Sequence, residues 1–397
     1  HKLIWNSLKA NWDYRFLKNN FYSFRFKLNM QRKFIFLLVF LILGGFLAFQ
    51  LVINPQSQEN GQEDYYQLED FDKVKKFDVH IHINTSETYF IEQAIEDNFY
   101  FLDIVDDRPF GLPMQKQQEF ALMHLKNFPS QMEFATTFKV SDWNQKDWVS
   151  STISNLKQSF AQGATAVKVW KNIGMDLKDE NGAFVMVDHP RIDSVLTYLT
   201  EIGVPLLGHN GEPRDCWLPL EEMTFNQGYY GDHPEYHMYL HPEYPSYENQ
   251  VEARDHMLQK HPDLDFMGAH LGSLEWSLEE LAKRLEAYPL MRVDLTRMPN
   301  LKLHTFNDRQ KSREFFITYQ DRLIYGTDTA INPTDDPDEL KEHIHQKWLD
   351  EWKFYATDSP LKLKGYGELR GLQLPREVID KIYFENASKL LGFKTKR

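Results

Sequence analysis

Two histidines separated by one residue, His80 and His82, are the residues of this sequence best placed to do chemistry. They lie in DVHIHI, a β-branched run typical of a strand, and side chains two residues apart on a strand point to the same side. Two imidazoles near the end of one strand can bind a divalent metal ion together. Histidines that are simply hydrogen-bonded within a core are the alternative for such a pair.

Three further polar side chains each follow a short apolar run. His209 closes LLGHNG, His270 closes FMGAHLGS, and Asp328 follows YGT in RLIYGTDT. A single His or Asp in this position is usually a cap or loop residue, but here four different strands end in such a group. Because imidazole and carboxylate ligands suit zinc and similar divalent ions, the whole set predicts a metal site.

These residues need a scaffold that gathers the carboxyl ends of distant strands. From residue 78 onward, apolar runs alternate with helical patterns, which indicates parallel strands joined by helical crossovers. Eight such units predict an α/β fold, a (β/α)8 TIM barrel over residues 78–392. A doubly wound open sheet is the alternative, but no glycine-rich phosphate loop follows the first strand. The expected strands are 78–83, 99–105, 132–139, 165–170, 203–208, 265–270, 291–296 and 322–327, and the expected helices are 87–98, 115–127, 145–162, 190–202, 247–260, 275–287, 307–320 and 375–391.

At these residues the chain resembles the amidohydrolase superfamily, and in particular its amidohydrolase-related group, which includes aminocarboxymuconate semialdehyde decarboxylase. The motifs are DVHIHI, GVPLLGHNG, FMGAHLGS, RLIYGTDT and ENASKLLGF, spread over the whole expected barrel. The resemblance implies one or two divalent metal ions, zinc above all. It implies that His80, His82 and His209 bind metal. His270 would be a ligand or catalytic base, and Asp328 a ligand and proton acceptor.

Lys168, in ATAVKVWKN, is expected on the fourth strand. This string is similar to the strand that carries the carboxylated lysine of dihydroorotase-like and urease-like members, where a carbamate bridges two metal ions. Burial lowers the pKa of a lysine and favours this modification. The decarboxylase-like members generally lack this use of lysine and hold one metal. Alternatively, Lys168 pairs with Asp328 or another buried carboxylate.

The charge distribution at such a site suggests a mechanism. A divalent metal lowers the pKa of bound water, Asp328 takes the proton and later delivers it, and the metal with a protonated His270 stabilises the oxyanion. The expected function is metal-dependent hydrolysis of an amide, lactone or ester bond in a small molecule. Non-oxidative decarboxylation at one metal is the alternative within the family. The non-enzymatic alternative is a membrane-tethered binding protein without turnover. A hydrolase with a serine nucleophile is not expected, because the sequence has no GxSxG elbow.

The longest irregular stretch, residues 209–246, is rich in Tyr, His and Pro. Long loops at the carboxyl face of a barrel usually build the pocket, although a surface excursion is the alternative. The residues expected to contact substrate are Trp170, Lys171, Arg214, Tyr230, His233 and His237. Charged residues beside the second and seventh strands could also line the pocket: Asp103, Asp106, Asp107, Asp294 and Arg297.

The first part of the chain has a different character. Residues 1–33 carry eight Lys/Arg and one Asp, and residues 34–53 form a charge-free apolar run. Such a run is long enough to cross a bilayer, and the basic flank predicts a cytoplasmic N-terminus with the barrel outside the cytoplasm. A cleaved signal starting at Met30 would instead export the barrel, but an uncleaved anchor is favoured. Residues 54–77 are polar and acidic and are expected to be a linker.

Composition narrows the partners. The net charge is −13, and without residues 1–33 it is −20, so nucleic-acid binding is not expected. Cys216 is the only cysteine, which excludes an internal disulfide and a cysteine-based zinc site. The expected partners are a small-molecule substrate and, through residues 34–53, a membrane. Assembly into a homo-oligomer is left open.

Overall fold

The computed structural model describes residues 64–108 and 111–394. The expected basic segment and membrane anchor, and the first ten residues of the expected linker, lie outside the described residues, so the anchor and the localisation stay predictions. Within residues 64–108 and 111–394, no helix combines the length and apolar character needed to cross a membrane. The described end of the linker packs onto the fold, because Phe71 is buried against the rings of Phe99 and Trp352.

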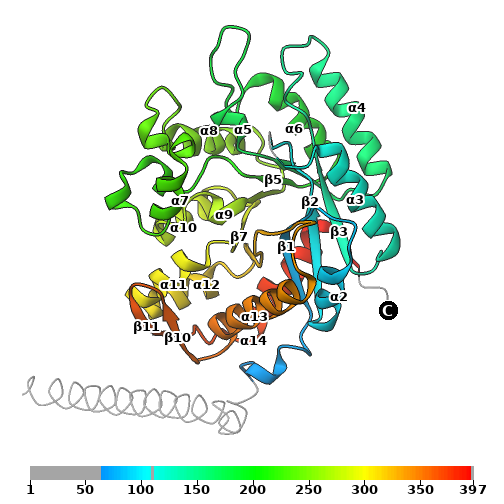
Figure 1. The fold of residues 1–397 in the computed structure, drawn as a ribbon. Helices are drawn as coiled ribbons and strands as arrows, with labels where there is room; N and C mark the ends of the chain where they lie inside the picture. Colours follow the sequence, from blue (N-terminus) through cyan, green and yellow to red (C-terminus); the bar gives the residue numbers. More distant parts are fainter. Residues whose placement is uncertain (1–63, 109–110, 395–397) are drawn as a thin grey trace, which may run out of the picture. The chain divides into compact units, whose positions relative to one another are not determined.

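A curled sheet of parallel strands forms the centre of the described part (Figure 1). Its order is β8-β7-β6-β5-β4-β3-β2-β1-β9. The sheet closes because β8 and β9 belong to one segment, residues 323–331, which pairs with β7 at its start and with β1 at its end. This arrangement agrees with the (β/α)8 barrel expected from the sequence. The strands are β1 (Lys76–Ile83), β2 (Phe99–Ile104), β3 (Met132–Thr137), β4 (Ala166–Val169), β5 (Leu206–Gly208), β6 (Phe266–Gly268), β7 (Met291–Asp294), β8 (Leu323–Ile324) and β9 (Thr329–Ile331).

The crossover helices lie outside the sheet (Figure 1). All eight expected helices are present, most of them within two or three residues of the expected bounds, although the last is divided by a π-helical turn at Lys381–Glu385. They are α2 (Tyr89–Glu96), α3 (Met114–Asn127), α4 (Trp148–Ala161), α6 (Pro190–Ile202), α8 (Tyr247–Lys260), α10 (Leu278–Ala287), α12 (Arg309–Thr318), and α14 (Arg376–Asp380) with α15 (Asn386–Leu391).

Sequence reasoning missed the region between the eighth strand and the last helix. This region holds α13 (Pro337–Ala356) and the hairpin of β10 (Pro360–Leu363) and β11 (Gly367–Arg370). Sequence reasoning also missed α11 (Met298–Asn307), which lies between β7 and α12. Asp336 caps α13 by accepting the backbone N–H groups of Asp338 and Glu339, and Pro337 occupies its first position. This Asp-Pro start is a recognisable helix signal.

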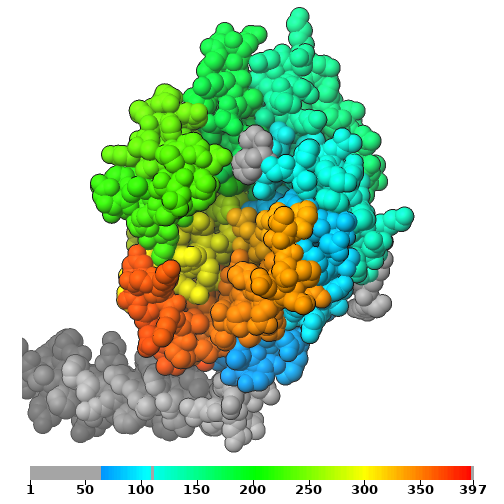
Figure 2. Space-filling model, in the orientation of Figure 1, coloured from blue at the N-terminus to red at the C-terminus, as the bar shows by residue number. Residues whose placement is uncertain are grey.

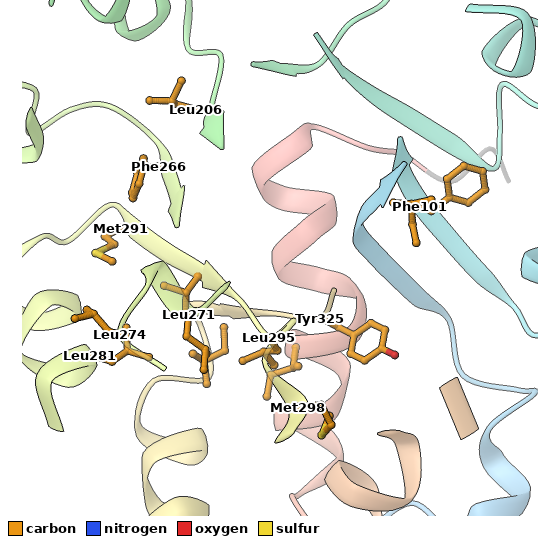
Figure 3. Close-up of a cluster of buried hydrophobic side chains, with 14 of the residues drawn as sticks. Phe101, Leu206, Phe266, Leu271, Leu274, Leu281, Met291, Leu295, Met298 and Tyr325 are labelled. Atoms are coloured by element: carbon orange, nitrogen blue, oxygen red, sulfur yellow. The ribbon is translucent and has the colours of Figure 1, made fainter. Parts of the chain in front are cut away.

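The core has two layers. The outer layer lies between the sheet and the helices, and Figure 3 shows Leu206, Phe266 and Met291 in it, side by side on β5, β6 and β7. The inner layer fills the barrel with the side chains that alternate with these, such as Leu207 and Met267. Because α15 adds Leu390 and Leu391 with other apolar groups to the inner layer, it packs against one end of the barrel.

Candidate active site

An irregularity in β1 orients its two histidines. The pairing register of β1 with β2 shifts between Asp78 and Ile81, which is the effect of a β-bulge. Val79 therefore packs in the inner layer, whereas Ile81 packs in the outer layer. Asp78 contacts Trp348 outside the barrel, and its carboxylate accepts the backbone N–H of His80. His80 and His82 then both turn to the mouth of the barrel.

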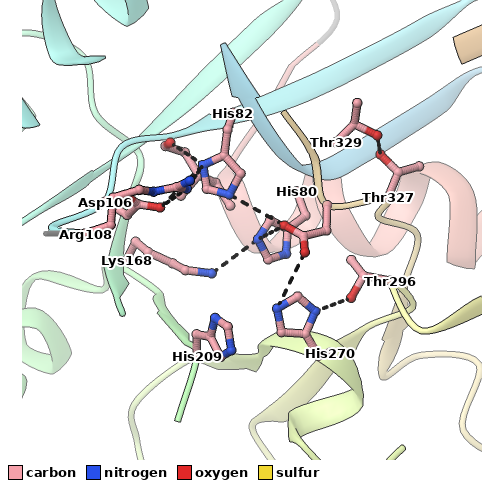
Figure 4. Close-up of polar contacts among 12 residues, drawn as sticks. His80, His82, Asp106, Arg108, Lys168, His209, His270, Thr296, Thr327 and Thr329 are labelled. Atoms are coloured by element: carbon pink, nitrogen blue, oxygen red, sulfur yellow. Dashed lines mark hydrogen bonds and ion pairs between the residues drawn. The ribbon is translucent and has the colours of Figure 1, made fainter. Parts of the chain in front are cut away.

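The histidines of β1 meet a carboxylate from the segment that joins β8 to β9, the strand beside β1. Asp328 Oδ1 lies 3.3 Å from His80 Nε2 and 3.6 Å from His82 Nε2, and its Oδ2 lies 3.8 Å from His270 Nε2. Ligand atoms of His80, His270 and Asp328 all lie within 4.8 Å of one another. Figure 4 shows the ring of His209 and the side-chain amine of Lys168 facing the same space. We call these six residues, with Lys168 included, the metal cluster: His80, His82, Lys168, His209, His270 and Asp328.

Hydrogen bonds fix the tautomer of the three imidazoles nearest to Asp328. His80 Nδ1 donates to the Asp294 carboxylate at 2.7 Å, and His82 Nδ1 donates to the Ile104 carbonyl at 2.9 Å. The Thr296 hydroxyl donates its only proton to Asp294, so its oxygen accepts from His270 Nδ1 at 2.7 Å. With every Nδ1 protonated, each Nε2 presents a lone pair to the cluster.

Burial favours the neutral form of three imidazoles of the metal cluster. It lowers the pKa of His82 and of His209, and it lowers the pKa of His270 to about 3. Burial alone would raise the pKa of Asp328, but the positive charge that His80 and His270 carry when protonated outweighs this effect and holds the Asp328 pKa well below its usual value. The side chain of Asp328 is nevertheless 42% exposed, so solvent or substrate can reach it.

The residues after β6 and β8 adopt strained backbone conformations. His270 has φ of 57° and Asp328 has φ of 56°, in the left-handed region that few non-glycine residues occupy. Leu271 and Ser273 follow with φ of 59° and 56°. Such strain persists where the surroundings over-determine a geometry, as at functional sites. Here it turns both side chains from the strand ends towards the cluster.

The donor set fits a divalent metal ion. Neutral imidazole lone pairs that face a carboxylate repel it unless a cation lies between them. His209 Nε2 is buried without a hydrogen-bond partner within the described chain, and it lies 3.7 Å from Glu212 Oε2. Lys168 Nζ lies 3.4 Å from His80 Nε2, and burial lowers its pKa. Within the described residues, Lys168 makes no ion pair with Asp328 or with another buried carboxylate, which was the alternative considered for it.

The expected role of a protonated His270 in stabilising an oxyanion stays a prediction. Burial lowers the pKa of the His270 imidazole to about 3, which favours its neutral form. The sequence placed His270 after a strand but could not show its burial or its neighbours. His270 is therefore available as a ligand or proton acceptor.

Two of the expected substrate contacts lie at the cluster side of the mouth. Lys171 pairs with Glu212, and burial lowers the Lys171 pKa to about 8, while Asp328 acts on it through space. The Lys171 ammonium lies 5.3 Å from the ring centre of Trp170. Glu212 itself was missed by sequence reasoning, although it follows His209 in the same GHNGE string.

The other four expected contacts belong to loop 209–246, which Figure 2 shows in green beside a hollow that faces the orange residues after β9. Tyr230 and His237 are buried, and their rings stack at 5.7 Å. The side chain of His233 is 47% exposed. The guanidinium of Arg214 lies 4.4 Å over the ring of Trp276. These four contribute no ligand atom to the metal cluster, and their contact with substrate stays a prediction.

Three residues support the cluster from behind. Asp294 is fully buried and accepts hydrogen bonds from His80, Thr296 and the backbone of His270. Asp106, buried beside His82, pairs with Arg108. Asp294 and Asp106 were noted as pocket-lining candidates, but a sequence cannot distinguish a residue that lines a pocket from one that lies beneath it.

A sequence profile of the family described as Amidohydrolase matches residues 174–393. A search of curated proteins finds no match.

Three solved structures are similar in fold, each with a TM-score below one half. A 2,6-dihydroxybenzoate decarboxylase from Rhizobium is 13% identical, with a TM-score of 0.46 over 80% of this chain and 99% of that chain. A 2-pyrone-4,6-dicarboxylic acid hydrolase from Pseudomonas putida is 12% identical, with a TM-score of 0.45 over 81% and 99%. A 4-oxalomesaconate hydratase from Rhodopseudomonas palustris is 12% identical, with a TM-score of 0.43 over 80% and 95%. Because the profile match spans more than half of the sequence, the chain belongs to the amidohydrolase family.

Proposed function

We propose that this protein is a metal-dependent hydrolase that cleaves an amide, lactone or ester bond of a small molecule. The observation that carries the proposal is the convergence of three Nε2 lone pairs on one ionised carboxylate. Each imidazole is fixed from behind by a hydrogen bond to Nδ1, which is how proteins orient metal-ligating histidines. His209 Nε2, which makes no hydrogen bond within the described residues and lies 3.7 Å from Glu212 Oε2, would add a fourth donor.

His80, His82, His209 and Asp328 would hold the cation, with His270 beside it. When bound, a divalent cation such as zinc supplies Lewis acidity and brings the pKa of water towards neutrality. The partly exposed carboxylate of Asp328 would accept the proton of the attacking water and return it to the leaving group. The neutral imidazole of His270 would orient Asp328 and serve as a second acceptor.

Lys168 bears on the number of ions. Its amine is buried, its pKa is lowered, and it contacts His80 rather than a carboxylate. A neutral amine can capture carbon dioxide, and we propose that Lys168 is carboxylated when two ions are bound. If Lys168 stays unmodified, the site would hold one ion.

Decarboxylation is the second candidate, and Arg108 favours it. Its Nη2 lies 3.3 Å from His82 Nδ1, so a guanidinium lies beside the cluster where it could hold a carboxylate that is to be lost. Its existing pair with Asp106 would have to be shared with such a substrate.

The test is a metal analysis joined to a turnover assay. Purified protein would be stripped with a chelator, reloaded with zinc, manganese or cobalt, and incubated with a panel of esters, lactones and N-acyl amides. We expect hydrolysis that disappears on stripping and returns with metal. Carbon dioxide release from a parallel panel of aromatic carboxylic acids, without any hydrolysis, would replace the hydrolase proposal with the decarboxylase. An anomalous-scattering map would count the ions and show whether Lys168 carries extra density.

A further inference from the structure

Three buried polar atoms at the β6–β7 side of the barrel have no hydrogen-bond partner within the described chain. They are Glu275 Oε2, Arg297 Nε and Asn300 Oδ1, and we call their residues the rim cluster. As whole residues, Glu275 and Asn300 are only 2% and 6% exposed. Since buried polar groups are nearly always paired, three such atoms in one place need an explanation.

The three residues are neighbours in space. His304 Nε2 donates to the Glu275 carbonyl at 2.8 Å, so one face of α11 contacts the chain at Glu275. Asn300 lies four residues earlier on α11 and therefore on the same face. Arg297 is the residue at which α11 begins. Burial raises the pKa of Glu275 to about 7, and the guanidinium of Arg297 opposes this shift, which places the two charges close together.

The rim cluster adjoins the metal cluster. Arg297 directly follows Thr296, whose hydroxyl oxygen lies 2.7 Å from His270 Nδ1. Arg297 also acts through space on the hydroxyl of Tyr230, a buried residue of loop 209–246. A ligand that is bound at the metal cluster and extends past His270 towards the start of α11 would therefore approach Arg297.

Arg297 differs from the other arginines with an unpartnered buried Nε. Arg322 donates through Nη2 to the carbonyls of Tyr288 and Met291, and Arg376 lies over the ring of Tyr66. Arg297 has no hydrogen bond or ion pair with any residue in 64–108 or 111–394. The charge of Arg297 acts on the Glu275 carboxylate, but Glu275 Oε1 already accepts the backbone N–H of Arg214.

We infer that Arg297 and Asn300 bind a carboxylate of the substrate while its scissile bond lies at the metal cluster. A guanidinium binds a carboxylate through paired N–H donors, and the side-chain amide of Asn300, turned either way, adds another donor. Burial raises the pKa of Glu275 to about 7, so its carboxyl group can hold a proton and donate it to the same group. This inference rests on the proposed function and narrows its substrate class to anionic amides, lactones or esters.

The experiment compares dicarboxylates with monocarboxylates of equal chain length. Succinate, glutarate and adipate, and butanoate, pentanoate and hexanoate, would be titrated calorimetrically into zinc-loaded full-length protein. One carboxylate can lie at the metal cluster and the second at Arg297, so we expect one dicarboxylate to bind at least tenfold more tightly than its monocarboxylate. In Arg297→Gln this ratio should fall to near one. Arg370→Gln removes an exposed charge on β11 and should leave the ratio unchanged.

Asn300→Ala provides a second variant in case Arg297→Gln does not fold, and it should lower the ratio about threefold. Equal binding of mono- and dicarboxylates by the wild-type protein, or a ratio that survives Arg297→Gln, would overturn the inference. The same preparations would be assayed for zinc content and for hydrolysis of the ester panel. A retained dicarboxylate preference without hydrolysis would refute the proposed function and leave the carboxylate site standing. Hydrolysis without the preference would do the reverse.

Discussion

The metal cluster and the rim cluster lie on the same rim of the barrel but differ in whether their buried polar atoms have hydrogen-bond partners. In the metal cluster, every Nδ1 of His80, His82 and His270 is tied to a buried acceptor. In the rim cluster, Glu275, Arg297 and Asn300 each leave a buried polar atom unpartnered. Both arrangements cost stability, the first through backbone strain at His270 and Asp328 and the second through desolvation.

The difference indicates two kinds of ligand. A metal ion demands fixed distances, so its ligands are held in place before it arrives. A carboxylate brings its own hydrogen-bond acceptors, so a donor such as Arg297 Nε can stay unpaired until the substrate supplies a partner. A site of each kind, linked through the consecutive residues Thr296 and Arg297, suits a substrate that is held at one end and cleaved at the other.

The largest expected effect comes from the removal of two ligands of the metal cluster. In the double variant His80→Ala, His82→Ala, we expect bound metal to fall from one or two equivalents to almost none, because two fixed donors are lost together. The barrel should still fold, since the inner layer on either side of the pair is apolar. Metal content by mass spectrometry and circular dichroism are the measurements. His256→Ala, which removes an exposed histidine on α8, is the control. Unchanged metal in the double variant would contradict the ligand assignment.

The next largest effect concerns Asp328 in its proposed role as proton acceptor. Asp328→Asn should fold, because asparagine tolerates the left-handed backbone found at this position. We expect kcat to fall about a hundredfold or more, as for a lost general base. The assay is hydrolysis of whichever panel compound the wild-type protein cleaves, at equal metal content. Wild-type rates at full metal occupancy would show that Asp328 does not carry the proton.

The sequence predicted most of the scaffold because its signals are local. Each strand from 78–83 to 322–327 is a short apolar run, and each was found with its position in the barrel order. α13 was missed although its Asp336-Pro337 start is recognisable, because its charged and aromatic residues show only a weak apolar stripe. Its position depends on long-range packing, such as the stacking of Trp348 on Phe99 with ring centres 4.0 Å apart.

The same difference between local sequence signals and long-range contacts holds at the candidate active site. His80, His82, His209, His270 and Asp328 follow apolar strands, so their convergence could be expected from the barrel alone. The tautomers could not, because they depend on partners such as Asp294 and Thr296 that only the fold brings near. Nor can a sequence show an unpartnered atom, and Arg297 therefore carried no more weight than any other charged residue after a strand.

A third prediction tests whether fixed orientation matters in the metal cluster. Asp294→Asn keeps the shape of a residue that accepts from His80, Thr296 and the His270 backbone, but its amide replaces one acceptor by a donor. We expect metal affinity to fall about 10- to 100-fold, as for lost partners of metal-bound histidines. Competition with a chromogenic chelator measures this. Asp106→Asn, beside His82, should have a smaller effect because its hydrogen bonds go to Arg108. Equal affinity in wild type and Asp294→Asn would remove the contrast between the two clusters.

The smallest expected effect has the opposite sign and tests the rim cluster alone. Asn300→Leu removes a buried polar side chain that has no hydrogen bond and replaces it with an apolar one of similar size. We expect the free energy of unfolding to rise by about 1 kcal/mol, because no partner is lost and the desolvation cost disappears. Asn386→Leu is the matched control. Its amide donates to the carbonyls of Gln320 and Leu323, so the same change there should lower the free energy of unfolding by about 2 kcal/mol. Urea unfolding measures both. If Asn300→Leu were as destabilising as Asn386→Leu, Asn300 would be a paired structural residue, and the rim cluster would not be held open for a ligand.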